Sequence, residues 1–169
     1  LLISLLFTGC FGLKPAGGKS AKGLYDSFYV GEEGTQYFIE KIKLKNDEGA
    51  DLGLDFTFRY DKSLEKDATV NFSIFSEKIY KTVSSVTFSN SVTSFSTDSV
   101  KFYFNDKKKK EIESRFTTEV PLTVVNELFK NSDWKINVVT NPDLSTFTTK
   151  GKTTKAIESL NENLFIFFR

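Results

Sequence analysis

The sequence predicts a mainly β domain, either an antiparallel β-sandwich or an open barrel of about eight strands, with two short helices. Apolar residues alternate with polar ones through most of the chain after residue 35, and this period of two is typical of strands that bury one face. The alternating segments recur at a spacing of about 8–12 residues and are separated by turn-forming residues. Only two segments have helical spacing. The alternative is an α+β fold in which an antiparallel sheet carries its helices on one face.

Residues 52–60, LGLDFTFRY, give the clearest strand. One face of this strand is polar, and the other holds Leu52, Leu54, Phe56, Phe58 and Tyr60. Residues 37–45 form the strand before it, with Phe38, Ile42 and Leu44 expected to point inward and Glu40 interrupting the pattern. The connecting residues 46–51, NDEGAD, are typical of a turn, so the two strands are expected to pair as a hairpin.

The alternation continues toward the C-terminus. Further strands are expected at residues 69–75, 86–88, 92–95, 100–104, 116–120, 134–138 and 144–150. In the fourth of these, Val100, Phe102 and Phe104 are expected to face the core. The 18 Phe residues supply large apolar surfaces, so residues 24–169 are expected to form a single domain with one core.

Two segments depart from the period of two. Residues 121–132 predict a helix of about two turns that Thr123 can cap, with an apolar face formed by Val124, Val125, Leu128 and Phe129. Residues 154–168 predict a second helix, capped by Thr153 or Thr154, whose apolar residues Ile157, Leu160, Leu164 and Phe168 recur at helical spacing. A helix of this length depends on tertiary packing. We therefore expect it to seal one open side of the sheet.

The composition excludes several classes of function. The net charge is +1 and there is no His, so no broad field favours nucleic acid and no mechanism can use an imidazole base. A single Cys allows no internal disulfide and no thiolate zinc site. Gly151-Lys152-Thr153 lacks the upstream Gly of a phosphate-binding loop, because that position is Thr146. We expect no enzyme activity, no cofactor, no metal and no nucleic-acid partner.

The single Cys follows an apolar run at the start of the chain, LLISLLFTGC. Thr8 and Gly9 are small and directly precede Cys10, and the run from Leu1 to Phe7 contains only Ser4 as a polar residue. This stretch resembles the lipobox of bacterial lipoproteins, although Phe7 stands where Leu is usual. The resemblance implies a diacylglycerol on the Cys10 sulfur and cleavage after Gly9.

The resemblance also implies how the chain is divided. Residues 1–9 would be the remnant of a signal peptide, and we expect the initiator Met and its basic segment to lie upstream of Leu1. Residues 10–23 would be the lipidated Cys and a flexible tether, rich in Gly, Ala and Lys. Residues 24–169 would then lie in the cell envelope on the extracytoplasmic side, at the outer membrane if the source is Gram-negative.

Charged and aromatic residues suggest further sites. Lys150, Lys152 and Lys155 surround the expected start of the second helix and are candidate anion contacts; the alternative is a solvated connection, which we favour. Lys107 to Lys110 are expected at a hairpin tip that discourages edge-to-edge pairing. Glu40 and Arg115 are expected to form an interior pair. The aromatic residues near the tether are expected to pack on the core, with an exposed contact surface as the alternative: Tyr25, Phe28, Tyr29 and Tyr37.

The function expected from the sequence is binding or scaffolding. The protein would be attached to the membrane through lipid on Cys10, and its second partner would be a protein or glycan of the envelope. One alternative is a carrier of an apolar ligand in a Phe-lined cavity between sheet and helices. A second alternative is a hydrolase of envelope polymers that uses two carboxylates facing each other across strands.

Overall fold

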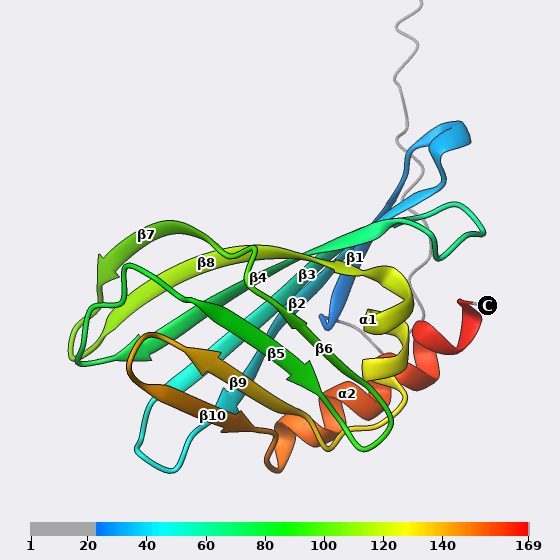
Figure 1. Ribbon diagram of the computed structural model, residues 1–169. Helices are drawn as coiled ribbons and strands as arrows, with labels where there is room; N and C mark the ends of the chain where they lie inside the picture. Colours follow the sequence, from blue (N-terminus) through cyan, green and yellow to red (C-terminus); the bar gives the residue numbers. More distant parts are fainter. Residues whose placement is uncertain (1–22, 169) are drawn as a thin grey trace, which may run out of the picture.

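The computed structural model describes residues 23–168. They form ten strands, two α-helices and two short 3₁₀ helices (Figure 1). The strands are β1 Tyr25–Tyr29, β2 Thr35–Lys45, β3 Asp51–Tyr60, β4 Asp67–Ser76, β5 Ser85–Ser89, β6 Ser94–Thr97, β7 Lys101–Lys107, β8 Ile112–Pro121, β9 Lys135–Val139 and β10 Leu144–Thr148. The helices are η1 Gly31–Glu33, α1 Leu122–Phe129, α2 Lys152–Asn163 and η2 Phe165–Phe167.

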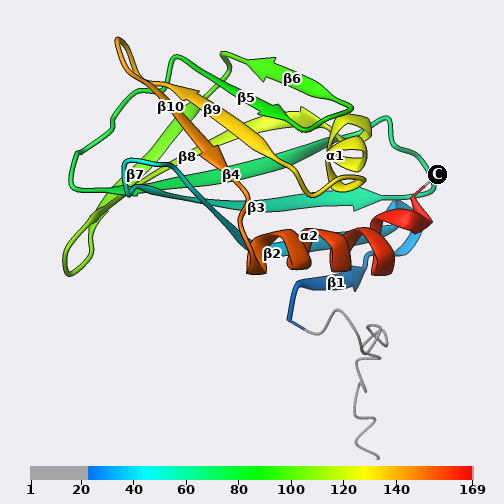
Figure 2. The same cartoon turned by 90° about the horizontal axis from the view of Figure 1, so that it is seen from below.

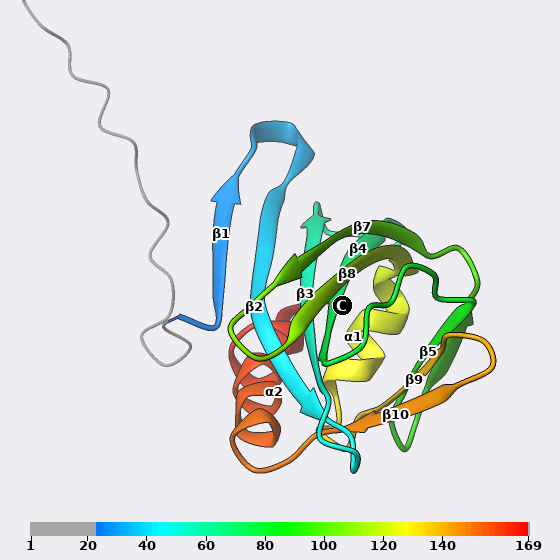
Figure 3. The same ribbon diagram turned by 90° about the vertical axis from the view of Figure 1, so that its left-hand side faces the viewer.

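All ten strands belong to one antiparallel sheet that curls into a half-barrel. Their order is β6-β5-β9-β10-β2-β3-β4-β8-β7, and β1 also pairs with β2. Figure 3 looks along the curve, with α1 lying inside it and α2 beside β2. The prediction of a mainly β fold with an open barrel and two helices is confirmed. The sheet has two strands more than the number expected.

The two edges of the sheet are joined by a very short connection. The edge strands β6 and β7 are consecutive in the sequence, and only residues 98–100 separate them. The Val100 amide donates to the Asp98 carbonyl at 2.8 Å, and the Thr118 hydroxyl donates to the Ser99 carbonyl at 2.9 Å. Because three residues span a short distance, the edges of the sheet approach each other at this corner.

The core fills the inside of the curve. On β3 the predicted alternation is confirmed, because Leu52, Leu54, Phe56 and Phe58 are all buried. Aromatic rings connect this strand to the helices. Phe56 contacts Phe129 with ring centroids 5.5 Å apart, and the Phe129 ring stacks on Phe165 at 3.9 Å. The helices therefore close the half-barrel by packing aromatic side chains against its inner face.

An asparagine from another part of the chain binds the C-terminal end of α1. Asn90, in the turn between β5 and β6, donates its side-chain amide to the carbonyls of Glu127 and Leu128 at 3.1 and 2.9 Å. Its carboxamide oxygen accepts hydrogen bonds from two amides of its own turn. Two of the last four carbonyls of α1 thereby accept hydrogen bonds from Asn90. The predicted cap at the other end was wrong, because α1 begins at Leu122 after Pro121 and Thr123 lies inside its first turn.

The second helix takes the place of a neighbouring strand along part of β2. On that side of β2, β10 pairs at a single position, Thr148 with Lys45, and α2 follows directly (Figure 2). The Thr153 hydroxyl donates to the Lys43 carbonyl at 2.6 Å. The prediction that Thr153 or Thr154 caps this helix was wrong. Gly151 occupies the cap position. Neither described helix is long and apolar enough to cross a membrane.

A β-bulge in β2 reverses the predicted inward and outward faces at its start. Ile39 pairs with Phe56 and Ile42 with Leu54, so β2 contains one residue more than β3 between these pairs. Ile39, Ile42 and Leu44 are buried, whereas Phe38 is exposed. The inward assignment of Phe38 was wrong because a bulge shifts the alternation by one residue.

Strand β7 also differs from its prediction. Phe102 and Phe104 were expected to face the core, but both are more than two-fifths exposed. A second irregularity in pairing with β8 lies between them, and β7 is an edge strand with a neighbour on one side only. The predicted strand at residues 92–95 is also displaced, because β6 begins at Ser94 and Val92 lies exposed in the preceding turn.

Candidate functional site

A groove is hollowed into the sheet face opposite the core. Its residues come from β2, β3, β7 and β8, and its volume is about 420 Å³. We call it the outer groove, and its lining consists of Phe38, Ile39, Glu40, Lys41, Asp55, Thr57, Phe104, Glu113 and Arg115. The groove combines charged side chains on the floor with two Phe rings. Volumes of this size are typical of sites for small ligands.

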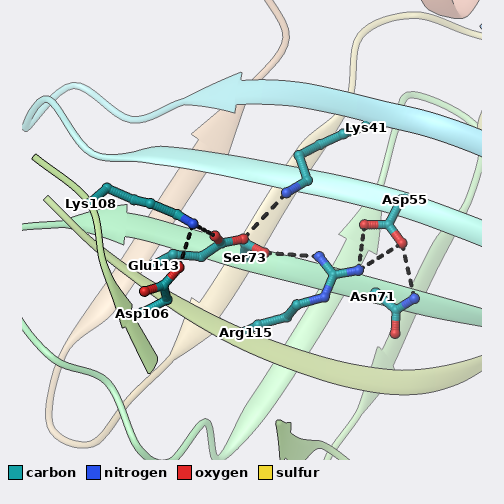
Figure 4. A network of polar contacts seen from close by, with 8 residues as sticks. All are labelled: Lys41, Asp55, Asn71, Ser73, Asp106, Lys108, Glu113 and Arg115. Atoms are coloured by element: carbon teal, nitrogen blue, oxygen red, sulfur yellow. Dashed lines mark hydrogen bonds and ion pairs between the residues drawn. The ribbon is translucent and has the colours of Figure 1, made fainter. Parts of the chain in front are cut away.

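Arg115 and Asp55 form the first of two ion pairs on the groove floor. Nη2 of Arg115 donates to both carboxylate oxygens of Asp55, at 3.0 and 2.9 Å (Figure 4). Asn71 donates to the same carboxylate at 2.9 Å, and Nη1 of Arg115 donates to the Ser73 hydroxyl at 3.0 Å. Register explains these contacts, because Asn71 lies opposite Asp55 and Ser73 opposite Arg115.

Glu113 is the centre of the second ion pair. It is buried, and its carboxylate lies 3.3 Å from Nζ of Lys41 and 3.5 Å from Nζ of Lys108. Lys41 comes from β2 and Glu113 from β8, with β3 and β4 between them. The pair therefore spans the groove floor and links β2 to β8 across the two strands that separate them.

Gly53 leaves the space in which the Lys41 side chain crosses the sheet. A Cβ atom at this position would lie 2.7 Å from Cδ of Lys41 and 3.3 Å from Cε2 of Phe75. The Lys41 ammonium also lies 5.2 Å from the centre of the Phe75 ring, within the range of a cation–π contact. A larger residue at position 53 would push Lys41 away from Glu113.

The surroundings of Glu113 favour its charged form. Burial raises the pKa of this carboxyl, but the Ser73 hydrogen bond and the charges of Lys41 and Lys108 outweigh burial. The net result is a lowered pKa. A carboxyl whose pKa is lower in the folded state stabilises the fold above its unfolded pKa, and this contribution is lost as the pH falls through the folded pKa.

We predict that Glu113→Gln makes stability less sensitive to acid. The free energy of unfolding of the unmodified protein should fall as the pH drops below about 4.3, the ordinary pKa of a Glu carboxyl, because the unfolded state then binds a proton at Glu113 that the folded state still excludes. The variant should be less stable at neutral pH and should lose less on acidification. Urea unfolding at a series of pH values measures this. Lys41→Gln, which keeps the carboxyl and removes one cation, should give an intermediate slope; parallel curves for all three proteins would contradict the prediction.

Aromatic rings flank the charged floor. Phe38 is 41% exposed and Phe104 is 43% exposed, and both line the outer groove. Phe28 on β1 extends the aromatic surface beyond Phe38, with ring centroids 5.9 Å apart in an edge-to-face arrangement. Exposed rings beside a polar floor are typical of recognition surfaces.

The predicted ion pair between Glu40 and Arg115 does not form. Arg115 pairs with Asp55 and not with Glu40, which is exposed on the bulge of β2. The prediction was wrong because the bulge turns this part of the strand. Sequence inspection also missed Asp55, Ser73 and Glu113 as a group, since they lie on three different strands. The only sign of this group in the sequence was that its members are polar residues at outward positions of their strands.

The other predicted site residues lie elsewhere. Lys150, Lys152 and Lys155 surround the start of α2, and Lys150 lies 3.3 Å from the Asp47 carboxylate. Their role as anion contacts stays a prediction. Cys10 lies outside the described residues. Residues 108–111, which include three of the four predicted lysines, form the turn between β7 and β8, as expected for a hairpin tip.

The four aromatic residues expected to pack on the core near the start of the domain divide into two pairs. Tyr25 and Tyr37 contact each other, with centroids 6.3 Å apart, and pack against the core. Phe28 and Tyr29 are exposed, at 57% and 71%. The expectation of core packing therefore holds for two of the four residues, and the other two form an exposed surface on β1.

Two alternatives can be compared with this geometry. The Phe rings between sheet and helices contact one another, as the 3.9 Å stack of Phe129 on Phe165 illustrates. On the outer face, the carboxylates of Asp55 and Glu113 are each held by cations.

Within residues 23–168, no group of three His, Cys, Asp or Glu side chains could hold a metal ion.

Comparison with known proteins gives no family for the chain. No family model matches the sequence, and no curated protein and no solved structure shows significant similarity to it.

Proposed function

We propose that this protein is a membrane-anchored bacterial lipoprotein whose extracytoplasmic β domain binds or scaffolds another envelope component through the outer groove. The observation that carries the binding role is the combination of exposed rings, Phe38 and Phe104, with a charged floor in one groove. Single exposed rings are common, but exposed apolar residues that adjoin one another and are rimmed by polar groups mark contact sites. Their position beside fixed polar groups supports recognition of a partner there.

The anchor in this proposal is lipid on Cys10. It rests on Thr8-Gly9-Cys10 behind an apolar run, and two acyl chains suffice for stable membrane attachment. The protein would then lie in the cell envelope, at the outer membrane in a Gram-negative source. Its partners would be the membrane and a protein or glycan of the envelope.

Binding without catalysis has more support than the two alternatives. A general acid at neutral pH requires a raised carboxyl pKa, and the pKa of Glu113 is lowered. This weakens the case for a hydrolase. A carrier needs an apolar cavity between sheet and helices. Phe56, Phe129 and Phe165 pack on one another there, and the hollow of about 390 Å³ beside the helices is lined by Asn126, Lys130 and Asn161 as well as by apolar residues. The carrier therefore has less support than binding at the outer groove.

The proposal predicts that groove variants lose binding to cell envelopes. The full chain with Cys10→Ser, which removes any contribution from lipid, is incubated with isolated envelopes of the source cells and sedimented. It should sediment with them, and addition of Phe38→Ser and Phe104→Ser should leave most of it in the supernatant.

A matched control uses Val92→Ser and Leu144→Ser. Both residues are 63% exposed and neither lines the groove, so this double variant removes as much exposed apolar surface elsewhere. It should sediment like the parent. Equal sedimentation of the groove variant and the control variant would count against the outer groove as the binding site.

A further inference from the structure

We infer that the ligand of the outer groove is an uncharged oligosaccharide, a chain of pyranose rings that carry hydroxyl or acetamido groups. This inference rests on the proposed function and specifies the chemistry of the partner. It follows from the pairing of the groove charges, from the two rings, and from the strand pairing beneath the floor.

Four of the five charged side chains that line the groove are paired with one another. Arg115 is paired with Asp55 and Lys41 with Glu113, so an anionic ligand would have to break a pair to reach a cation. Glu40, the fifth, is exposed, and an ion pair that a cationic ligand formed with it would contribute little. Breaking a partly buried pair leaves an uncompensated charge, which is strongly unfavourable. The lining contains three carboxylates and two cations, so anions are disfavoured further. An uncharged ligand avoids both costs.

The remaining polar groups suit hydroxyl groups. Thr57 and Glu40 line the groove, and neither side chain bonds to another described residue. Asp55 accepts three hydrogen bonds, and a carboxylate has about four acceptor positions. A hydroxyl both donates and accepts, so it can bond to these groups without disturbing the ion pairs.

The rings select a ligand with an apolar face. Phe38 and Phe104 present ring surface beside the polar floor, and the face of an aromatic ring is electron-rich. The C–H bonds on one side of a pyranose are polarised toward positive hydrogen and stack on such a face, while the hydroxyl groups lie at the sugar's edge. A ligand with an apolar face and polar edges matches this arrangement of rings and floor.

A peptide strand fits the floor less well. Peptides that dock on sheets use unpaired backbone groups at a sheet edge. The residues Asp55 and Thr57 lie on β3, and Glu113 and Arg115 lie on β8; each of these strands is paired on both sides. The strands that supply these four residues therefore offer side chains and no free edge; the free edge of the sheet belongs to β7, which contributes only Phe104 to the lining.

The test compares one tetrasaccharide backbone in three charge states. The full chain with Cys10→Ser is titrated with the β-1,4-linked tetramer of N-acetylglucosamine, with the cationic glucosamine tetramer and with a sulfated tetramer, and amide shifts are followed by NMR. The neutral tetramer should shift the amides of Glu40, Asp55 and Thr57 at millimolar concentrations. Its affinity should not change between low and high salt, because no ion pairs form with it.

Ring variants show whether stacking contributes. Phe38→Ala and Phe104→Ala should each weaken binding of the neutral tetramer about tenfold. Phe167→Ala, which removes a 70% exposed ring that does not line the groove, should leave it unchanged. Absence of groove shifts, or tighter binding of either charged tetramer, would overturn the inference. If envelope sedimentation still depends on the groove in that case, the proposed function stands and only the ligand class is wrong.

Discussion

Replacing Phe165 with alanine is expected to lower the free energy of unfolding by about 3–5 kcal/mol. Phe165 is 2% exposed and lies in η2, after α2. Its ring stacks on Phe129 at 3.9 Å and also contacts Phe58 at 5.8 Å. Removing it leaves a cavity where the end of the chain meets both α1 and β3. Denaturant unfolding followed by fluorescence of the single Trp134, which is buried beside Phe129, measures the loss.

A neighbouring residue provides the control. Phe167 lies two positions further along the same turn and is 70% exposed. Phe167→Ala should change the free energy of unfolding by less than about 0.5 kcal/mol.

Amides of Ile157 to Leu164 should exchange with solvent as slowly as those of Leu54 to Phe58 if α2 is docked as firmly as β3. Equal effects at the two Phe positions, or fast exchange in α2, would show that this segment does not seal the half-barrel.

Replacing Cys10 with serine is expected to move the protein from the membrane fraction to the soluble fraction. Serine cannot form the thioether on which the proposed lipid attachment depends. Each buried methylene contributes about 0.8 kcal/mol to membrane binding, so loss of the lipid should be close to all-or-none. Expression of the full-length gene in a bacterium, followed by fractionation and intact-mass measurement, tests this. The mature protein should begin at Cys10 and carry the mass of the acyl groups.

A conservative change in the leader serves as the matched variant. Thr8→Ser keeps a small residue before Gly9 and should leave both processing and membrane location unchanged. An uncleaved leader, or a mature N-terminus without acyl mass, would contradict lipid attachment at Cys10. The result is independent of the outer groove, so it separates the anchor from the binding site.

Local sequence patterns were sufficient where a segment follows one period throughout. On β3 the alternation from Leu52 to Phe58 corresponds directly to burial. In α2 the helical spacing of Ile157 and Leu160 does the same, and Leu164, the next residue in this spacing, is buried directly after the helix. Each pattern repeats several times within its own element, so no knowledge of the partner is needed.

The patterns were insufficient where one extra residue changes the face that a strand presents. In β2 the bulge after Ile39 places Phe38 outside and leaves Glu40 exposed. A reader of the sequence sees only that Glu40 interrupts the alternation. The interruption is the trace of the bulge, but its position and effect depend on pairing with β3.

The groove network was beyond prediction for a related reason. Asp55 meets Arg115 because β4 lies between their strands with a particular register. A shift of one residue in either pairing would send these side chains to opposite faces. Polar residues at outward positions are common on every sheet, so their partners emerge only once the strand order is known.

The strand order of the sheet has a consequence for the order of folding. Strands β1 to β4 form successive hairpins that can pair soon after synthesis, but β4 must wait for β8, and Lys45 on β2 must wait for Thr148. Such distant pairings are slow to form. Until η2 is made, Phe56, Phe58 and Phe129 lack the aromatic cover that Phe165 gives them, directly or through Phe129. The nascent chain therefore exposes an apolar surface until residues 165–168 have emerged, and chaperones that hold it in this interval would raise its yield.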